Sequence, residues 1–109
     1  MTNDARPEVR NLKQMLQYQE DAVVSRMLVK NLAGNVTLFA FDGNEGLSEH
    51  TVPYDALVIG IEGLAEIAVG GVCHTLSEGE SLLMPSNVPH AVNPLDRFKM
   101  LLIMIRGVG

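Results

Sequence analysis

Two of the three histidines in this chain, His50 and His90, are the residues best suited to chemistry. Each borders a short apolar run of the kind that forms a strand. Imidazole titrates close to neutral pH, so a pair of histidines can exchange protons or bind a ligand carboxylate. The alternative is that the two rings only line the fold, hydrogen-bonded to water or to each other. The sequence leaves both interpretations open.

His74 and Cys73 are adjacent in the chain. Consecutive residues of a strand point to opposite faces, so this thiol and this imidazole cannot meet as nucleophile and base. We expect Cys73 to be a buried thiol and His74 to face solvent or a sheet edge. A single cysteine also excludes an internal disulfide, which is typical of a reducing, cytoplasmic setting.

The charge distribution restricts the partners. The net charge is -5, and the stretch between Lys30 and Arg97 holds nine Asp and Glu residues but no Lys or Arg. Nucleic acid needs a basic track for its phosphates, so we expect no nucleic-acid binding. An anion held by that stretch would need a metal, a histidine or backbone N–H groups. No apolar run reaches the roughly 18 residues of a membrane span, and the N-terminus lacks the apolar segment of a secretory signal, so we expect no membrane partner.

The histidines must be positioned by one small all-β domain. At 109 residues the chain is long enough for one core and too short for two. We expect residues 1–8 to form a mobile tail and residues 9–109 to form the domain. Apolar residues at helical spacing predict a short helix at about residues 9–18. The expected strands that follow cover residues 22–30, 36–42, 47–51, 55–61, 64–69, 72–76, 81–85, 90–92 and 98–105. Short strands with glycine-containing turns are typical of an antiparallel β-sandwich or small barrel.

The turns and the last strand can be specified in more detail. Glu62-Gly63 and Gly70-Gly71 are expected to be hairpin turns, because glycine adopts positive φ without steric cost. Pro85 has no N–H for the ladder and should end a strand. The last run, residues 98–105, is apolar at nearly every position and should be covered on both faces. A domain this small has little with which to cover the second face, so we expect a homodimer made through the end strands.

The stretches 50–63, HTVPYDALVIGIEG, and 79–94, GESLLMPSNVPHAVNP, resemble the two signature motifs of the cupin barrels. Those motifs are written G-x5-H-x-H-x3-4-E-x6-G and G-x5-P-x-G-x2-H-x3-N. His50 and Gly63 match the first motif, and Gly79, Pro85 and His90 match the second. The resemblance covers about residues 35–105. It implies a small jelly-roll barrel, or double-stranded β-helix, of the RmlC-like, single-domain bacterial kind.

The chain departs from the cupin pattern where a metal would be held. Val52 replaces the second histidine, Ala56 the glutamate, Asn44 the opening glycine, and Asn87 and Pro94 the glycine and asparagine of the second motif. In a complete motif, three imidazoles and a carboxylate would bind iron, manganese, nickel or zinc. Two histidines alone rarely hold a divalent metal tightly, since even open catalytic zinc sites keep three protein ligands. We therefore expect no tightly bound cofactor.

Asp55 is the residue that could complete a set of two histidines and one carboxylate. Strand parity places it on the face opposite to His50, unless Pro53 breaks the strand. We favour a carboxylate that accepts backbone N–H bonds in the turn after Pro53.

Three functions are consistent with these residues. We favour a binding module that holds a small molecule in the barrel interior, among His50, Tyr54 and His90, without a tightly held metal. The second candidate is a metal-dependent cupin enzyme, an oxygenase or isomerase, with a divalent transition metal on His50, His90 and Asp55. The third is a structural or regulatory dimer with a vestigial cavity. Whether the protein is an enzyme is left open, because function belongs to the site and not to the barrel.

Overall fold

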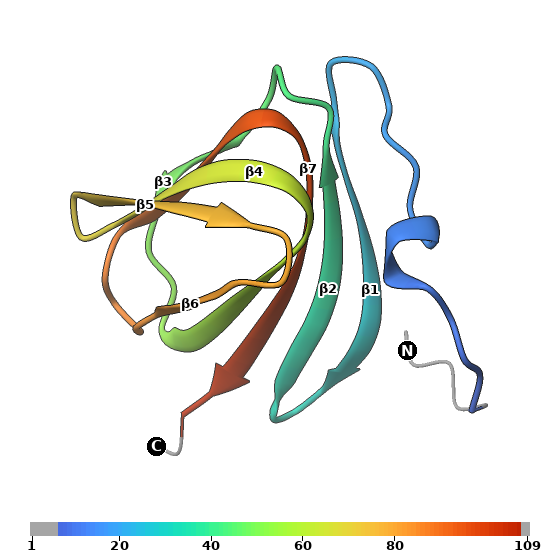
Figure 1. The fold of residues 1–109 in the computed structure, drawn as a ribbon. Coiled ribbons are helices and arrows are strands. Elements are labelled where there is room, and N and C mark those ends of the chain that lie inside the picture. The colour runs from blue at the N-terminus through green and yellow to red at the C-terminus, as the bar shows by residue number, and fades with distance from the viewer. Residues whose placement is uncertain (1–6, 108–109) are drawn as a thin grey trace.

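The computed structural model describes residues 7–107 of the chain, and these form one antiparallel sheet that curls around a common core (Figure 1). The strands are β1 (Val23–Asn31), β2 (Gly34–Phe41), β3 (Leu47–His50), β4 (Tyr54–Val69), β5 (Val72–Ser77), β6 (Ser81–Met84) and β7 (His90–Arg106). Their order is β1-β2-β7-β4-β5, with β3 paired to β7 and β6 paired to β4. The all-β antiparallel fold expected from the sequence is confirmed.

The long strands β4 and β7 replace shorter strands expected from the sequence. The predictions of a hairpin at Glu62-Gly63, and of a break at residues 93–97 between two strands, are both wrong. β4 and β7 pair along nearly their whole lengths, with register shifts beside Glu62 and Gly63. Gly63 has a φ of 85°, and a Cβ there would overlap the carbonyl oxygen of Arg97. The glycine therefore bends β4 within the ladder instead of reversing the chain.

Two other turn predictions are confirmed. Gly70 and Gly71 have φ values of 58° and 83° and connect β4 to β5. Positive φ at both central residues is the requirement of the tight hairpin turn that matches the twist of paired strands. Strand β6 ends at Met84, directly before Pro85.

The helix predicted at residues 9–18 is wrong, because only a 3-10 helix, η1 (Leu12–Gln14), forms there. Side chains of the sheet take the carbonyl groups that an α-helix would use. The Lys99 ammonium donates to the Lys13 carbonyl, and the Arg26 guanidinium donates to the Met15 carbonyl. An isolated helix of this length is marginal in water, so contacts with the sheet can outweigh the helical spacing of its apolar residues. The tail predicted for residues 1–8 lies mostly outside the described residues.

The main core lies between the two halves of the curled sheet. Its buried hydrophobic residues are Phe41, Ala56, Val58, Ala65, Ile67, Leu76, Met84, Val92, Phe98, Met100 and Leu102. The rings of Phe41 and Phe98 lie 5.8 Å apart between centroids. On β7 the core residues Val92, Phe98, Met100 and Leu102 are all even-numbered and face inward, since side chains alternate along a strand.

The outer face of β7 is covered over only part of its length. Lys99 is 5% exposed, and its ammonium is bonded to the N-terminal segment. Leu101 and Ile103 are half-buried, and Ile105 is 58% exposed. The single chain therefore leaves the outer face uncovered towards the end of the strand, and the prediction that a second copy covers it stays a prediction.

Candidate functional site

His50 and His90 meet where β3 pairs with the start of β7. Their ring centroids lie 4.4 Å apart, with the ring planes at 66°. His90 has the inward parity of Val92 and is 5% exposed, whereas His50 is exposed. The pair thus has one buried and one accessible imidazole.

The loop before His90 is held by backbone contacts. The Asn87 amide donates to the Val52 carbonyl at 2.9 Å, and the Gly70 amide donates to the Pro89 carbonyl at 2.8 Å. Asn87 has a φ of 62°. Asparagine is among the residues that tolerate this left-handed conformation, so it can replace the glycine of the motif at this turn.

The hydrogen bonds of the two rings differ. His50 Nδ1 lies 2.8 Å from the Ser48 carbonyl oxygen. A carbonyl only accepts, so Nδ1 of His50 carries the proton, and in the neutral ring Nε2 is the acceptor. His90 Nδ1 is buried and has no hydrogen-bond partner among the described residues.

The pKa of His90 is lowered, chiefly because burial penalises the imidazolium and secondly because of the charge of His50. The backbone of Val88 opposes this shift more weakly. His90 is therefore neutral at pH 7, and its Nδ1 can serve as donor or acceptor depending on the tautomer.

The remaining residues of the cupin pattern do not extend the pair into a metal site. Ala56 is buried in the core and brings no carboxylate. Asp55 directly precedes Ala56 on β4 and is exposed on the opposite face. Its carboxylate accepts a hydrogen bond from the Ser86 amide at 3.0 Å. Within residues 7–107, no three His, Cys, Asp or Glu side chains gather as a metal site would require. Two imidazoles do not fit a tightly bound divalent metal.

Tyr54 lies at the start of β4 and contacts a different group. The Arg106 guanidinium carbon is 5.4 Å from the centroid of its ring, and Arg106 Nη2 donates to its hydroxyl at 3.4 Å. In the β4–β7 ladder Tyr54 pairs with Arg106 at one end, while His90 pairs with Val69 at the other. The polar contact of Tyr54 is therefore with Arg106 and not with the histidine pair.

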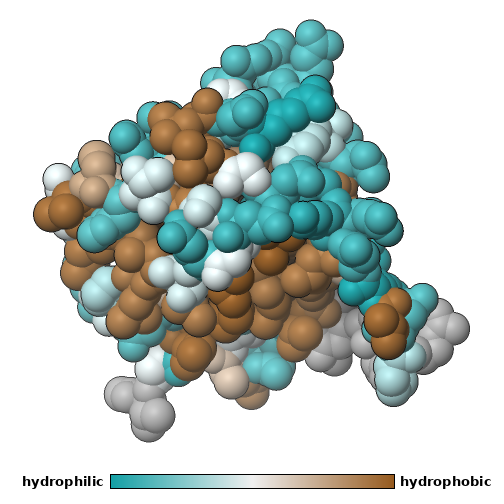
Figure 2. Space-filling model, viewed as in Figure 1, coloured by the Kyte–Doolittle hydropathy of each residue, from teal (hydrophilic) through white to brown (hydrophobic). Residues whose placement is uncertain are grey.

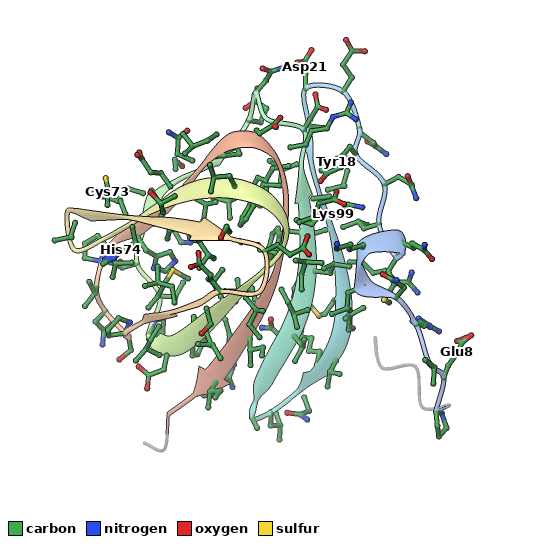
Figure 3. The ribbon with its side chains drawn as sticks, viewed as in Figure 1. Glu8, Tyr18, Asp21, Cys73, His74 and Lys99 are labelled. Carbon is green, nitrogen blue, oxygen red and sulfur yellow. The ribbon has the colours of Figure 1, made fainter. Side chains whose placement is uncertain are left out.

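Cys73 and His74 lie on the β4–β5 hairpin, with their side chains on opposite sides of the strand (Figure 3). Both residues are exposed. The prediction of a buried thiol is wrong, because β5 is an edge strand of the β1-β2-β7-β4-β5 order and its outer residues meet solvent. The expectation that His74 faces solvent agrees with its exposure.

A partly buried polar cluster beneath the N-terminal segment was not anticipated from the sequence. Lys99 Nζ lies 4.8 Å from the Tyr18 ring centroid and 3.9 Å from Glu62 Oε2, and the Tyr18 hydroxyl donates to Glu62 at 2.5 Å (Figure 3). Burial, followed by the hydrogen bond to Glu62, raises the pKa of Tyr18 well above its usual range. The only sequence signal was a lysine within the apolar run 98–105. The contacts indicate a clamp that holds the segment on the sheet.

Comparison with known proteins supports the same fold. A family model described as a cupin domain matches residues 37–106. A conserved protein of unknown function from Streptococcus pyogenes is 31% identical, with a TM-score of 0.89 over 95% of this chain and 91% of that chain. A cupin superfamily protein from Desulfitobacterium hafniense is 28% identical, with a TM-score of 0.87 over 93% of this chain and 94% of that chain.

A third relative is longer than this chain. A cupin 2 conserved barrel domain protein from Leptotrichia buccalis is 38% identical, with a TM-score of 0.86 over 89% of this chain and 47% of that chain. The chain thus spans about half the length of that protein. No functionally curated protein matches the chain. Among residues 7–107 no helix has the length and apolar character needed to cross a bilayer.

Proposed function

Because this chain belongs to the cupin family, we propose that its barrel binds a small molecule beside His50 and His90, without a tightly held metal. The family resemblance inferred from residues 50–63 and 79–94 is confirmed. The observation that carries the proposal is the meeting of two imidazoles, the exposed His50 and the buried His90, with ring centroids 4.4 Å apart. The accessible ring of His50 can contact a ligand directly, with the ring of His90 beside it.

The state of the two rings indicates the class of ligand. His50 offers an acceptor nitrogen, because its Nδ1 proton is directed at Ser48. Burial lowers the pKa of His90, so protonating this ring to pair with a carboxylate is unfavourable near neutral pH. His90 lies on the same inward face of β7 as Val92 of the apolar core. These features favour a small, neutral ligand that carries hydroxyl groups, since a hydroxyl can both donate to His50 and pair with His90.

The binding proposal can be tested by NMR with histidine ring carbons labelled. The probes are small neutral alcohols and phenols, each compared with a carboxylate of similar size. We expect neutral hydroxyl probes to shift the ring signals of His50 and His90 while His74, exposed on β5, serves as an internal control. His90→Leu should abolish the shift at His50. The proposal is wrong if no probe up to about 10 mM shifts the pair selectively, or if His90→Leu leaves the shifts intact.

The absence of a tight metal is a separate part of the proposal. Elemental analysis of protein purified without chelator should give well under one equivalent of iron, manganese, nickel or zinc. One full equivalent that survives gel filtration and is lost in His90→Leu would contradict it. That result would favour the metal-dependent enzyme.

A row of apolar residues on the outer face supports a second proposal, that the chain forms a homodimer. Direct cross-strand pairing runs through five strands in the order Leu83, Leu57, Ile103, Val36, Val29. Leu83 and Val29 are 59% and 41% exposed. Hydrophobic surface is visible in the lower part of Figure 2, where β2, β4 and β7 run. Such a row is self-complementary across a two-fold axis, so a second copy can cover it.

Light scattering after gel filtration tests the dimer. We expect the wild-type mass to be that of two chains, and Leu83→Lys to shift it towards one. Val72→Lys is the matched control, because Val72 is equally exposed at 59% but lies on β5, outside the row. A monomer mass for the wild type, or equal effects of the two variants, would contradict this interface.

A further inference from the structure

A pocket of about 220 Å³ lies at the ends of β1, β2, β4 and β7, away from the histidine pair. Its lining residues are Lys30, Asn31, Gly34, Asn35, Tyr54 and Arg106. Two of them are cations, and none of these described lining residues is acidic. The whole chain carries a net charge of -5, so a pocket with this lining is unlike the average surface of the protein.

The sheet register places the polar side chains on one side of the pocket. Lys30 pairs with Asn35 across β1 and β2, and Asn35 pairs with Met104 of β7. Met104 packs against the core, so this row faces inward. Tyr54 and Arg106 pair in the adjacent row, two residues beyond Met104 on β7. Side chains two residues apart share a face, so all four polar groups gather at the inner rim of the sheet.

The guanidinium of Arg106 is held before any ligand arrives. It lies 5.4 Å from the Tyr54 ring centroid and donates to the Tyr54 hydroxyl at 3.4 Å. The Arg106 amide donates to the Ala33 carbonyl at 2.7 Å, which anchors its backbone to the β1–β2 turn. The Tyr54 oxygen accepts from Arg106, so its own proton can be donated elsewhere. A group held in place loses less conformational entropy on binding.

We propose that this pocket binds the anionic group of a small organic acid, a carboxylate or a phosphate monoester. A guanidinium presents parallel N–H donors that match two oxygens of either group. Lys30 adds a second positive charge, and the Tyr54 hydroxyl adds a neutral donor. The pocket is smaller than the roughly 300–1,000 Å³ typical of drug-sized ligands, which restricts it to acids of few atoms. The site does not depend on the ligand proposed for the histidine pair.

The test is calorimetric and NMR titration of the full chain with succinate and, separately, with inorganic phosphate. We expect at least one of the two anions to bind and to shift the amide signals of Gly34 and Asn35. Arg106→Gln should weaken binding by about tenfold or more, as expected for the loss of a charge-assisted hydrogen bond. Lys30→Gln should weaken it several-fold. Affinity should fall as NaCl is added, since both cations are near solvent. Tighter binding of succinate would indicate a carboxylate ligand, and tighter binding of inorganic phosphate would indicate a phosphate monoester.

Arg97→Gln is the matched control. The Arg97 guanidinium carbon also lies over a tyrosine ring, 5.1 Å from the centroid of Tyr18, but Arg97 is not among the residues that line the pocket. This variant should bind within about twofold of the wild type, and His90→Leu should do the same. The proposal is overturned if neither anion binds, if the shifts occur away from β1, β2 and β7, or if Arg97→Gln and Arg106→Gln lose equal affinity. Thermal unfolding of each variant separates lost binding from lost folding, and Lys30→Gln provides a second reading if Arg106→Gln is unstable.

Discussion

Replacing His90 by leucine should stabilise this protein, although the residue is buried. His90 is 5% exposed and its Nδ1 has no partner among the described residues. The substitution removes that atom and keeps a side chain of similar bulk next to Val92. Most substitutions of buried residues lower the free energy of unfolding. An increase for His90→Leu would therefore be a strict test of the proposed unsatisfied nitrogen.

The magnitude follows from two opposing effects. Relief of a buried unsatisfied nitrogen is worth about 1–3 kcal/mol. Loss of the ring contact with His50, at 4.4 Å between centroids, costs about 0.5–1.5 kcal/mol. The difference favours the variant by about 1 kcal/mol, or a rise in Tm of about 4 °C for a domain of this size.

The stabilisation should grow at acid pH. The folded-state pKa of His90 is lowered from its ordinary value of 6.5. As the pH falls below about 6.5 the unfolded chain therefore takes up this proton before the folded protein does, and stability is lost. The loss continues until the pH has passed the lowered pKa. His90→Leu has no such group, so its advantage should be larger at pH 5 than at pH 7.5.

Urea unfolding followed by circular dichroism at the two pH values measures both effects. His50→Leu is the control, because His50 is exposed and its Nδ1 already bonds to Ser48. That variant should be neutral or slightly destabilised. The reasoning is refuted if His90→Leu lowers the free energy of unfolding by about 1 kcal/mol or more at pH 7.5. It is also refuted if wild type and variant lose stability equally towards pH 5.

Three further outcomes are expected. Gly71→Ala should lower the free energy of unfolding by about 1 kcal/mol, because Gly71 has a positive φ. Gly63→Ala should lower it by at least about 2 kcal/mol more, because its Cβ would also overlap the Arg97 carbonyl. Chemical denaturation compares the two variants, and equal losses of stability would disprove the bend at Gly63. Cys73 should react with a thiol reagent at one equivalent in the folded state, and protection would contradict its exposure. Lys99→Met removes the hydrogen bond to the Lys13 carbonyl, so it should speed proteolysis within residues 7–22 about tenfold. The amides of the barrel should keep their protection from hydrogen exchange. An unchanged cleavage rate would mean that other contacts hold the segment.

The candidate site was predictable in part. The motif spacing selected His50 and His90, and the structure brings their rings together. Strand parity separated Asp55 from them, and Asp55 is exposed on the other face of β4. The sequence predicted that Tyr54 and the two histidines surround one ligand. The ladder instead places it beside Arg106, at the far end of the β4–β7 pairing from His90.

The sequence determined the all-β class, the hairpin at Gly70-Gly71 and the end of β6 before Pro85. These features depend on the period of side chains and on the backbone freedom of a few adjacent residues. The sequence did not determine that β4 and β7 are each one continuous strand. Within β4, the local pattern of Glu62-Gly63 is that of a turn. Only pairing of both halves with one partner strand keeps the chain in the ladder.

The arrangement of charge was decided by the tertiary structure alone. The basic residues lie towards the two ends of the chain, which suggested that the central stretch could bind an anion only through a metal, a histidine or backbone N–H groups. The order β1-β2-β7-β4 places Lys30 and Arg106 around one pocket with Tyr54. Cross-strand register depends on contacts between residues far apart in the chain, and no local pattern encodes it. The histidine pair follows from local motifs, whereas the cationic pocket exists only because the sheet closes.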